Sequence, residues 1–147
     1  MMKGAQLANI LSHHKNTQGL FRGVYNKTNI SIAPLLDLNT FNIFVFNIKQ
    51  HWIALVIGND ISYFIDSLGA EPPADLQPMI QRWAQPLEMI PGKQVQSYKS
   101  IFCAYFTLYY ILRVLDATPK LYLSFEDLQK NDYIISNWFH KKWPSRK

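Results

Sequence analysis

The chain has 147 residues, a formal net charge of +5, 48% hydrophobic residues and 17% charged residues. This length is typical of one domain, and the apolar content is sufficient for one buried core, so we expect a single domain over residues 1–147. The composition excludes a disordered chain, which would contain fewer apolar residues and more charge. The basic balance favours polyanions or acidic protein surfaces as partners.

Cys103 is the single cysteine of the sequence. A lone thiol excludes an intramolecular disulfide and a metal site built from several thiolates, and it fits a reducing compartment. Residues 1–15 do not match a secretory signal, and the apolar run 101–112 is too short to cross a bilayer. We therefore expect no membrane insertion, no metal and no cofactor.

The clearest strand signals are three short segments rich in β-branched and aromatic residues, at 42–48, 52–57 and 62–66. Short polar turns separate them, at 49–50 and 58–60. Successive strands that are joined by short turns pair with their neighbours, so these segments predict an antiparallel meander.

The pattern of apolar residues changes after the meander. From Pro73 onward the spacing is helical and predicts an amphipathic helix that ends before Pro86. Two short strands, 87–90 and 93–96, are expected on either side of a turn at 91–92.

The last third of the chain is expected to be helical. The segment from Cys103 to Leu115 is long and apolar, which predicts a buried helix with Cys103 at its N-terminus. A last helix is expected to start after Ser124, whose hydroxyl can cap it, with Glu126 and Asp127 in its first turn. The predicted fold class is therefore α+β, with a central antiparallel or mixed sheet flanked by helices.

Cys103 is the candidate nucleophile. A free cysteine is most often a small buried hydrophobe, but here the thiol follows the polar loop 96–100 and opens an apolar helix. The positive end of the helix dipole then lies near the sulfur and favours the thiolate, which is the reactive form.

A thiolate nucleophile requires a base nearby, and His51 is the best placed of the histidines, at the start of a predicted central strand. The base in turn requires an acceptor for its second ring nitrogen, and Asp66 at the end of the neighbouring strand can supply it. The alternative for Asp66 is a turn or cap residue. The other histidines, His13, His14 and His140, lie in predicted end segments where solvated roles are expected.

Acyl transfer also requires a donor for the negative charge that develops on the carbonyl oxygen. Gln96, together with the backbone N–H of Cys103, is the candidate for this oxyanion hole. Gln94 is the competing candidate.

The order of these residues resembles one protease family. His51-Trp52 on a strand, Asp66-Ser67 after the next strand and Gln96 seven positions before Cys103 resemble the adenovirus maturation proteases and the related ubiquitin-like-specific proteases. Papain-like enzymes instead carry the cysteine before the histidine. The segments 20–27 and 128–142 also resemble the viral branch of this family.

The resemblance implies a fold like that of these viral proteases and a thiol endopeptidase activity. Cys103, His51 and Asp66 would form the catalytic triad, with Gln96 in the oxyanion hole. The substrates would be structural capsid or core precursor polypeptides that are cleaved during virion maturation. The expected location is the virion and the nucleus or cytoplasm of the host cell.

The sequence departs from the family pattern at two points. Ala104 stands where the family usually has glycine after the nucleophile, and it could narrow the oxyanion hole. The chain also lacks the second cysteine through which the viral enzymes bind an activating peptide, so a noncovalent peptide activator is the alternative. The basic end of the chain, with Lys141, Lys142, Arg146 and Lys147, is either a solvated tail or a surface for nonspecific DNA binding.

Two other functions remain open at this point. The first is an isopeptidase that removes ubiquitin or a ubiquitin-like modifier from other proteins. The second is a catalytically inactive module that binds DNA or protein through the basic surface.

Overall fold

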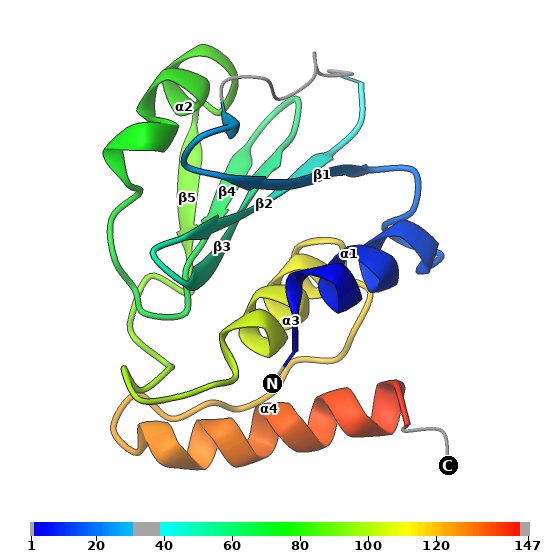
Figure 1. Cartoon of the computed structure of the whole chain (residues 1–147), viewed down its shortest axis with the longest axis vertical. Helices are drawn as coiled ribbons and strands as arrows, with labels where there is room; N and C mark the ends of the chain where they lie inside the picture. The colour runs from blue at the N-terminus through cyan, green and yellow to red at the C-terminus, as the bar shows by residue number, and fades with distance from the viewer. Residues whose placement is uncertain (1, 31–38, 145–147) are drawn as a thin grey trace.

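The computed structural model describes residues 2–30 and 39–144 and shows a mixed sheet with helices on both faces (Figure 1). The elements in chain order are α1 (Gly4–His13), β1 (Phe21–Asn26), β2 (Asn42–Ile48), β3 (His51–Ile57), β4 (Ser62–Ile65), the short 3-10 helix η2 (Ala74–Leu76), α2 (Gln77–Trp83), β5 (Leu87–Ile90), α3 (Cys103–Val114) and α4 (Leu128–Lys142). Arg146 and Lys147 lie outside the described residues.

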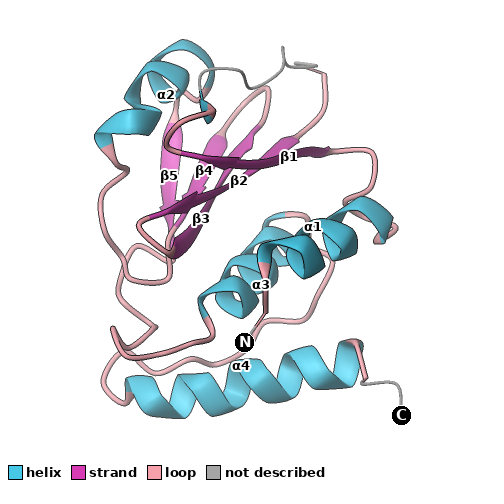
Figure 2. Cartoon of the chain, in the orientation of Figure 1, coloured by secondary structure: helices cyan, strands magenta, loops and turns pink. Residues whose placement is uncertain are grey.

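The sheet has five strands in the order β1-β2-β3-β4-β5 (Figure 2). The pairs β2–β3 and β3–β4 are antiparallel, which confirms the predicted meander. The outer strands β1 and β5 run parallel to their neighbours β2 and β4, so the sheet is mixed. The structure is therefore α+β, with a mixed sheet flanked by helices.

Both faces of the central strands are buried. Along β3, Ala54 and Val56 face the cluster that includes α1, α3 and α4, whereas Ile53 and Leu55 face the cluster that includes α2. Because each strand is covered on both sides, β2 and β3 have nearly continuous apolar sequences instead of an alternating pattern.

Helix α3 lies between the sheet and α4 (Figure 1). Most of its residues are buried, including the large side chains Phe106 and Tyr109. Cys103 is the first residue of this helix, where the sequence placed it. A helix that is apolar all round is expected in such an interior layer.

A tight turn joins β2 to β3. Ile48 pairs with His51, and the two residues between them, Lys49 and Gln50, have positive φ angles of 53° and 63°. Two consecutive positive φ values define the type I′ turn, which matches the twist of antiparallel strands. The turn places His51 at the first position of β3, at one end of the sheet.

The structure differs from the sequence-based expectations at three places. Residues 93–96 do not form a strand, because β5 pairs with β4 and the chain then turns back toward Ser67, whose carbonyl accepts the N–H groups of Val95 and Gln96. The elements α1 and β1 were missed altogether. The strand predicted for 62–66 ends at Ile65, so Asp66 follows β4.

The predicted cap of the last helix was also wrong. Helix α4 begins at Leu128, and its cap is Asp127, whose carboxylate accepts the N–H of Lys130 at 3.2 Å. The Ser124 hydroxyl instead accepts the N–H groups of Glu126 and Asp127 in a turn that precedes the helix. The described residues include no helix that is long and apolar enough to cross a membrane.

Candidate active site

Cys103 and His51 meet where α3 and β3 begin, although 52 positions separate them in the chain. The Cys103 Sγ lies 3.0 Å from the His51 Nδ1. The β2–β3 turn and the docking of α3 on β3 bring these two helix and strand ends together. The distance is within the range expected for a nucleophile and its base.

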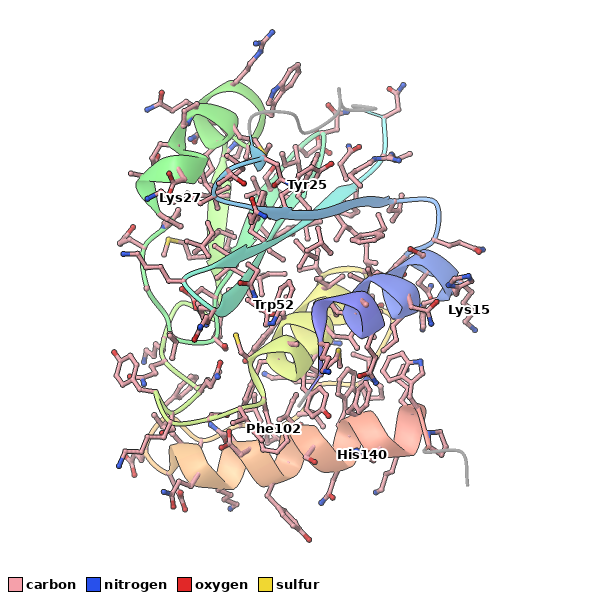
Figure 3. The ribbon with its side chains drawn as sticks, viewed as in Figure 1. Lys15, Tyr25, Lys27, Trp52, Phe102 and His140 are labelled. Atoms are coloured by element: carbon pink, nitrogen blue, oxygen red, sulfur yellow. The ribbon has the colours of Figure 1, made fainter. Side chains whose placement is uncertain are left out.

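The backbone of Trp52 also contacts the sulfur. Its N–H donates to the Cys103 Sγ at 3.1 Å, and its carbonyl oxygen lies 3.2 Å from the same atom. Cys103 is 8% exposed, so the thiol is mostly buried but not closed off. Figure 3 shows Trp52 between the sheet and the helices α1 and α3, and a side chain added at Gly4 would meet its indole ring.

Thr107 fixes α3 against β3 at this point. Its hydroxyl lies 3.2 Å from the Trp52 carbonyl oxygen and 3.0 Å from the Cys103 carbonyl oxygen, one helical turn earlier. Thr107 is fully buried. The contact holds the first turn of α3 in register with the start of β3, so the sulfur and the imidazole keep their separation.

Asp66 lies on the far side of the imidazole from Cys103. Its Oδ1 accepts a hydrogen bond from the His51 Nε2 at 2.6 Å and from the Leu68 N–H at 2.9 Å. Asp66 is 5% exposed and follows β4, the strand next to β3. The residue is therefore both a turn residue and the acceptor for His51, which brings together the three predicted triad residues.

The environment of His51 favours its charged form. Burial of the ring opposes the charge, but the hydrogen bonds to Asp66 and Cys103 and the negative charges of both groups outweigh it and raise the pKa of His51 to about 9. At neutral pH the imidazole therefore carries both protons, with Nδ1–H facing the sulfur and Nε2–H donating to Asp66. A hydrogen-bond donor that faces a cysteine sulfur stabilises the thiolate form.

Gln96 is a buried residue of the loop between β5 and α3. The carbonyl oxygen of Ser67 accepts the N–H groups of Val95 and Gln96 at 2.9 and 3.1 Å. The Ser67 hydroxyl donates to the Gln96 Oε1, and the Gln96 Nε2 lies 3.4 Å from the Ser100 carbonyl oxygen. Gln94, the competing candidate, donates its amide to the Gln96 carbonyl oxygen at 2.9 Å and so supports this loop.

The first turn of α4 holds the same loop from the other side. The Asn131 amide donates to the carbonyl oxygens of Val95 and Ser124, at 2.8 and 2.6 Å. The carboxylate of Asp132 accepts the Ser100 hydroxyl at 2.7 Å. The loop that ends at Cys103 is therefore anchored near its start and its end.

The other candidate histidines lie apart from this cluster. The Nδ1 atoms of His13 and His140 contact backbone carbonyls of their own helices, at Asn9 and Ser136. His14 is partly buried, and this burial together with nearby lysines lowers its pKa. None of these rings has a contact with Cys103 among the described residues.

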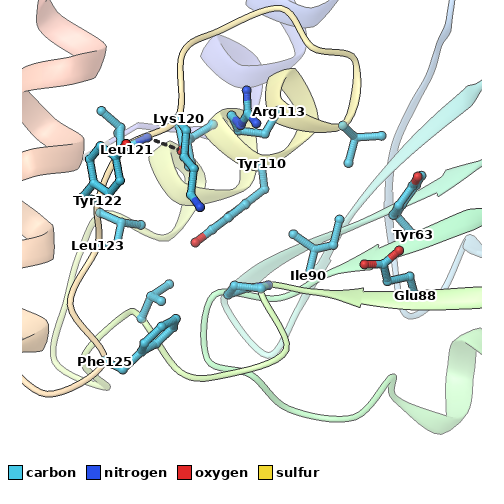
Figure 4. Close-up of a pocket in the computed structure, with 14 residues that line it drawn as sticks. Tyr63, Glu88, Ile90, Tyr110, Arg113, Lys120, Leu121, Tyr122, Leu123 and Phe125 are labelled. Atoms are coloured by element: carbon cyan, nitrogen blue, oxygen red, sulfur yellow. Dashed lines mark hydrogen bonds between the residues drawn. The ribbon is translucent and has the colours of Figure 1, made fainter.

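Two cavities are relevant to the search for a binding site. A cavity of about 480 Å³ opens beside the cluster, and both His51 and Asp66 line it together with apolar side chains such as Leu68. A larger cavity of about 710 Å³ lies between β5, α3 and the segment 120–125 (Figure 4). None of His51, Asp66, Gln96 and Cys103 lines the larger cavity, and Cys103 and Gln96 do not line the smaller one either.

Sequence reasoning missed three contributors to the site: Ser67, Thr107 and the backbone of Trp52. Ser67 follows the predicted acid directly, and Thr107 stands four positions after Cys103, which is one helical turn. Both residues could therefore have been selected from their spacing to Asp66 and Cys103. The contact of a backbone N–H with the sulfur leaves no trace in the sequence.

Within residues 2–30 and 39–144, no group of three or more His, Cys, Asp and Glu side chains is close enough to hold a metal ion. The chemistry that the cluster can support on its own is nucleophilic attack by sulfur with a histidine as proton carrier.

Comparison with known proteins does not assign the chain to a family. The sequence matches no protein-family model, and no curated protein shows a significant match. The case for a function therefore depends on the geometry of the cluster.

Proposed function

We propose that the protein is a thiol endopeptidase that hydrolyses peptide bonds with Cys103 as nucleophile. The observation that carries this proposal is the continuous line of contacts from the Cys103 Sγ through the two nitrogens of His51 to the Asp66 carboxylate. A structural histidine requires one such partner, whereas general acid–base catalysis on a thiolate requires both.

In the proposed reaction, the Cys103 thiolate attacks the carbonyl carbon of the substrate and forms a new carbon–sulfur bond. His51 gives its proton to the leaving amine as the carbon–nitrogen bond breaks, which produces a thioester. His51 then accepts a proton from water, the hydroxide attacks the thioester, and the carboxylic acid leaves while the thiolate is restored.

The remaining residues support charge and orientation. Asp66 keeps the imidazole oriented and compensates its positive charge. The Gln96 amide and the Cys103 N–H at the start of α3 are the donors for the oxyanion that forms in each half of the reaction. Donors of this kind each contribute about 3 kcal/mol to transition-state stabilisation in related chemistry.

The proposed substrates are viral structural precursor polypeptides, cleaved in the virion or in the host nucleus or cytoplasm. The supporting observation is the order His, Asp, Gln, Cys, which resembles the viral maturation proteases. A noncovalent peptide and DNA are the proposed activators.

The first experiment needs no substrate. At pH 7, iodoacetamide should alkylate Cys103 of the wild type at least about tenfold faster than Cys103 of His51→Ala, because the imidazolium stabilises the thiolate. The matched control is His140→Ala, whose ring is exposed and contacts its own helix, and it should react like the wild type. Equal and slow alkylation in all three proteins would favour the inactive binding module instead.

The second experiment tests hydrolysis. The protein is incubated with a complex mixture of peptides, and new termini are identified by mass spectrometry. We expect cleavage by the wild type, none by Cys103→Ala, and weak residual cleavage by Asp66→Ala, which keeps the nucleophile and the base. Persistent cleavage by Cys103→Ala would contradict the proposal. Labelling of Cys103 by a ubiquitin vinyl sulfone would redirect it toward the isopeptidase alternative.

A further inference from the structure

We infer that Ser67 is a positioning residue for the oxyanion hole, which fixes the side-chain amide of Gln96 so that its NH₂ group is presented to the reacting carbonyl. The inference rests on the proposed function and adds a residue to it. Ser67 does not touch the nucleophile, the base or the acid through its hydroxyl, so its role would be confined to the Gln96 side of the site.

Three hydrogen bonds join Ser67 to the Gln96 segment. The Ser67 carbonyl oxygen accepts the N–H groups of Val95 and Gln96, and the Ser67 hydroxyl donates to the Gln96 Oε1. Ser67 is 1% exposed and Gln96 is 3% exposed, so water does not compete for these groups. A buried pair of this kind loses little of its strength to solvent.

The hydroxyl contact determines which end of the Gln96 amide faces the loop residues that precede Cys103. A glutamine amide has an acceptor end and a donor end of nearly equal shape, and its neighbours decide the orientation. Because the Ser67 hydroxyl donates to the Gln96 Oε1, the Gln96 Nε2 points toward the loop that ends at Cys103. Among the described residues, its hydrogen-bond partner there is the Ser100 carbonyl oxygen, at the long distance of 3.4 Å. That weak contact leaves donor capacity for an oxyanion.

The Ser67 carbonyl oxygen holds the backbone of the loop, so the role of the Ser67 hydroxyl can be tested separately from the support of the loop. Removal of the Ser67 hydroxyl keeps both carbonyl contacts and therefore keeps the loop in place. The Gln96 Oε1 then lacks its partner, and the amide is free to rotate or reverse. Since preorganised donors stabilise the transition state without reorganisation, this loss should slow reactions that pass through an oxyanion.

Two small reagents separate this effect from the reactivity of the thiolate. Iodoacetamide alkylates the sulfur by displacing iodide, and no oxyanion forms. With p-nitrophenyl acetate, a carbon–sulfur bond forms, charge develops on the carbonyl oxygen, and the carbon–oxygen bond to p-nitrophenolate then breaks to leave an acetyl thioester. Cys103→Ala gives the background for the second reagent.

We expect Ser67→Ala to lower the acylation rate about tenfold, less than the roughly hundredfold or greater loss expected for Gln96→Ala, with alkylation within about twofold of wild type. Ser67→Thr, which keeps the hydroxyl, should recover most of the acylation rate. The matched control is Ser62→Ala, a buried serine of β4 whose hydroxyl accepts the Gly58 N–H away from the site, and it should leave both rates unchanged.

A double-mutant comparison guards against a folding defect. In the Gln96→Ala background, Ser67→Ala should cause no further loss of acylation, because the group that it positions is already gone. Acylation at the wild-type rate in Ser67→Ala, or equal losses of acylation and alkylation, would overturn the inference while leaving the triad intact. A wild-type protein whose alkylation does not depend on His51 would instead overturn the proposed function itself.

Discussion

His51 is held between two groups of opposite role, the thiol that it activates and the carboxylate that orients it. Its Nδ1 faces Cys103 at 3.0 Å and its Nε2 faces Asp66 at 2.6 Å. Each ring nitrogen therefore has a hydrogen-bond partner, and the ring cannot flip without losing both contacts. These two hydrogen bonds favour the charged imidazolium and so raise the pKa of His51.

The raised pKa of His51, about 9 in place of 6.5, makes the stability of the fold depend on pH. The stabilisation from the charged ring is fully present below pH 6.5, the pKa in the unfolded chain, and is lost as the pH rises through about 9. Because the ring is partly exposed to solvent, we expect a loss on the order of 1–2 kcal/mol in the free energy of unfolding. Urea denaturation at pH 6 and pH 9.5 measures it.

Asp66→Asn provides the comparison for this prediction, since the amide keeps the shape of the carboxylate without its charge. The variant should be less stable at pH 6 and should lose less stability on raising the pH to 9.5. An equal loss in wild type and variant would show that the pH dependence comes from other groups.

At the residue scale, the sequence singled out His51, Asp66 and Cys103, which the structure brings into contact, but not their local contacts. Their selection rested on residue type and chain order, and the predicted role of Gln96 in an oxyanion hole stays a prediction. Which ring nitrogen faces the sulfur depends on the backbone path, so it could not be predicted. The hydroxyl of Ser67 was overlooked because serine after a strand is most often a turn residue.

Among the elements, the β2–β3 hairpin departs most from its preferred sequence. A type I′ turn favours Asn-Gly, but Lys49 and Gln50 occupy it with φ angles of 53° and 63°. Gln50→Gly removes the steric cost of the left-handed conformation and should raise the free energy of unfolding by about 0.5–1 kcal/mol, measured by urea denaturation.

The control for this hairpin variant is Gln77→Gly at the start of α2, where φ is negative and glycine should destabilise the fold. Because the turn directly precedes His51, the alkylation rate of Cys103 is a second readout and should stay unchanged in Gln50→Gly. A loss of stability would contradict the turn assignment.

Helix α4 contributes to the site through Asn131, which is fully buried. Its side chain satisfies the Val95 and Ser124 carbonyl oxygens and accepts the Ser124 N–H at 2.7 Å. Asn131→Ala leaves these buried groups without partners and should lower the free energy of unfolding by about 2–4 kcal/mol in urea denaturation. Asn137→Ala, at an exposed position on the same helix, should change it by less than about 0.5 kcal/mol.

At the element scale, elements with a strong local sequence pattern were predicted correctly. Elements whose structure depends on a partner far away in the chain were not. The central strands and α3 follow from unbroken apolar runs. Strand β1 contains Gly23 and Arg22 and is held mainly by its parallel partner β2, which a local pattern does not indicate. The strand predicted at 93–96 is absent for the same reason, because the Ser67 carbonyl oxygen accepts the backbone N–H groups of Val95 and Gln96.

The whole molecule is basic, and part of its charge gathers where α4 ends. His140, Lys141 and Lys142 occupy consecutive exposed positions there. If DNA is a partner, as proposed, binding of a short duplex should weaken steeply with salt, by about 0.9 in log affinity per tenfold change of salt for each phosphate neutralised. Fluorescence anisotropy between 50 and 200 mM salt measures this slope.

Charge reversal locates the DNA surface. The double variant Lys141→Glu with Lys142→Glu should weaken binding and flatten the salt dependence. Reversal of two exposed lysines elsewhere, Lys49→Glu with Lys120→Glu, changes the net charge equally and should weaken binding less. Equal effects would assign the attraction to net charge alone, and salt-independent binding would exclude an electrostatic surface.

At the scale of the whole molecule, the class α+β and the mixed sheet were within reach of the sequence, whereas the order of the layers was not. The apolar character of 103–115 predicted that the helix is buried. That α3 lies between the sheet and α4 depends on how Phe106, Tyr109 and Phe139 pack in three dimensions. Such packing is decided by side-chain shape across segments that are far apart in the chain.

The distribution of the triad along the chain has a practical consequence. His51 and Asp66 precede the exposed segment at Glu71, and Cys103 follows it. A chain divided at this segment would carry the imidazole on one fragment and the thiol on the other. Covalent labelling of the sulfur would then report on the reassociation of the two fragments, which makes the protein a candidate scaffold for a split reporter.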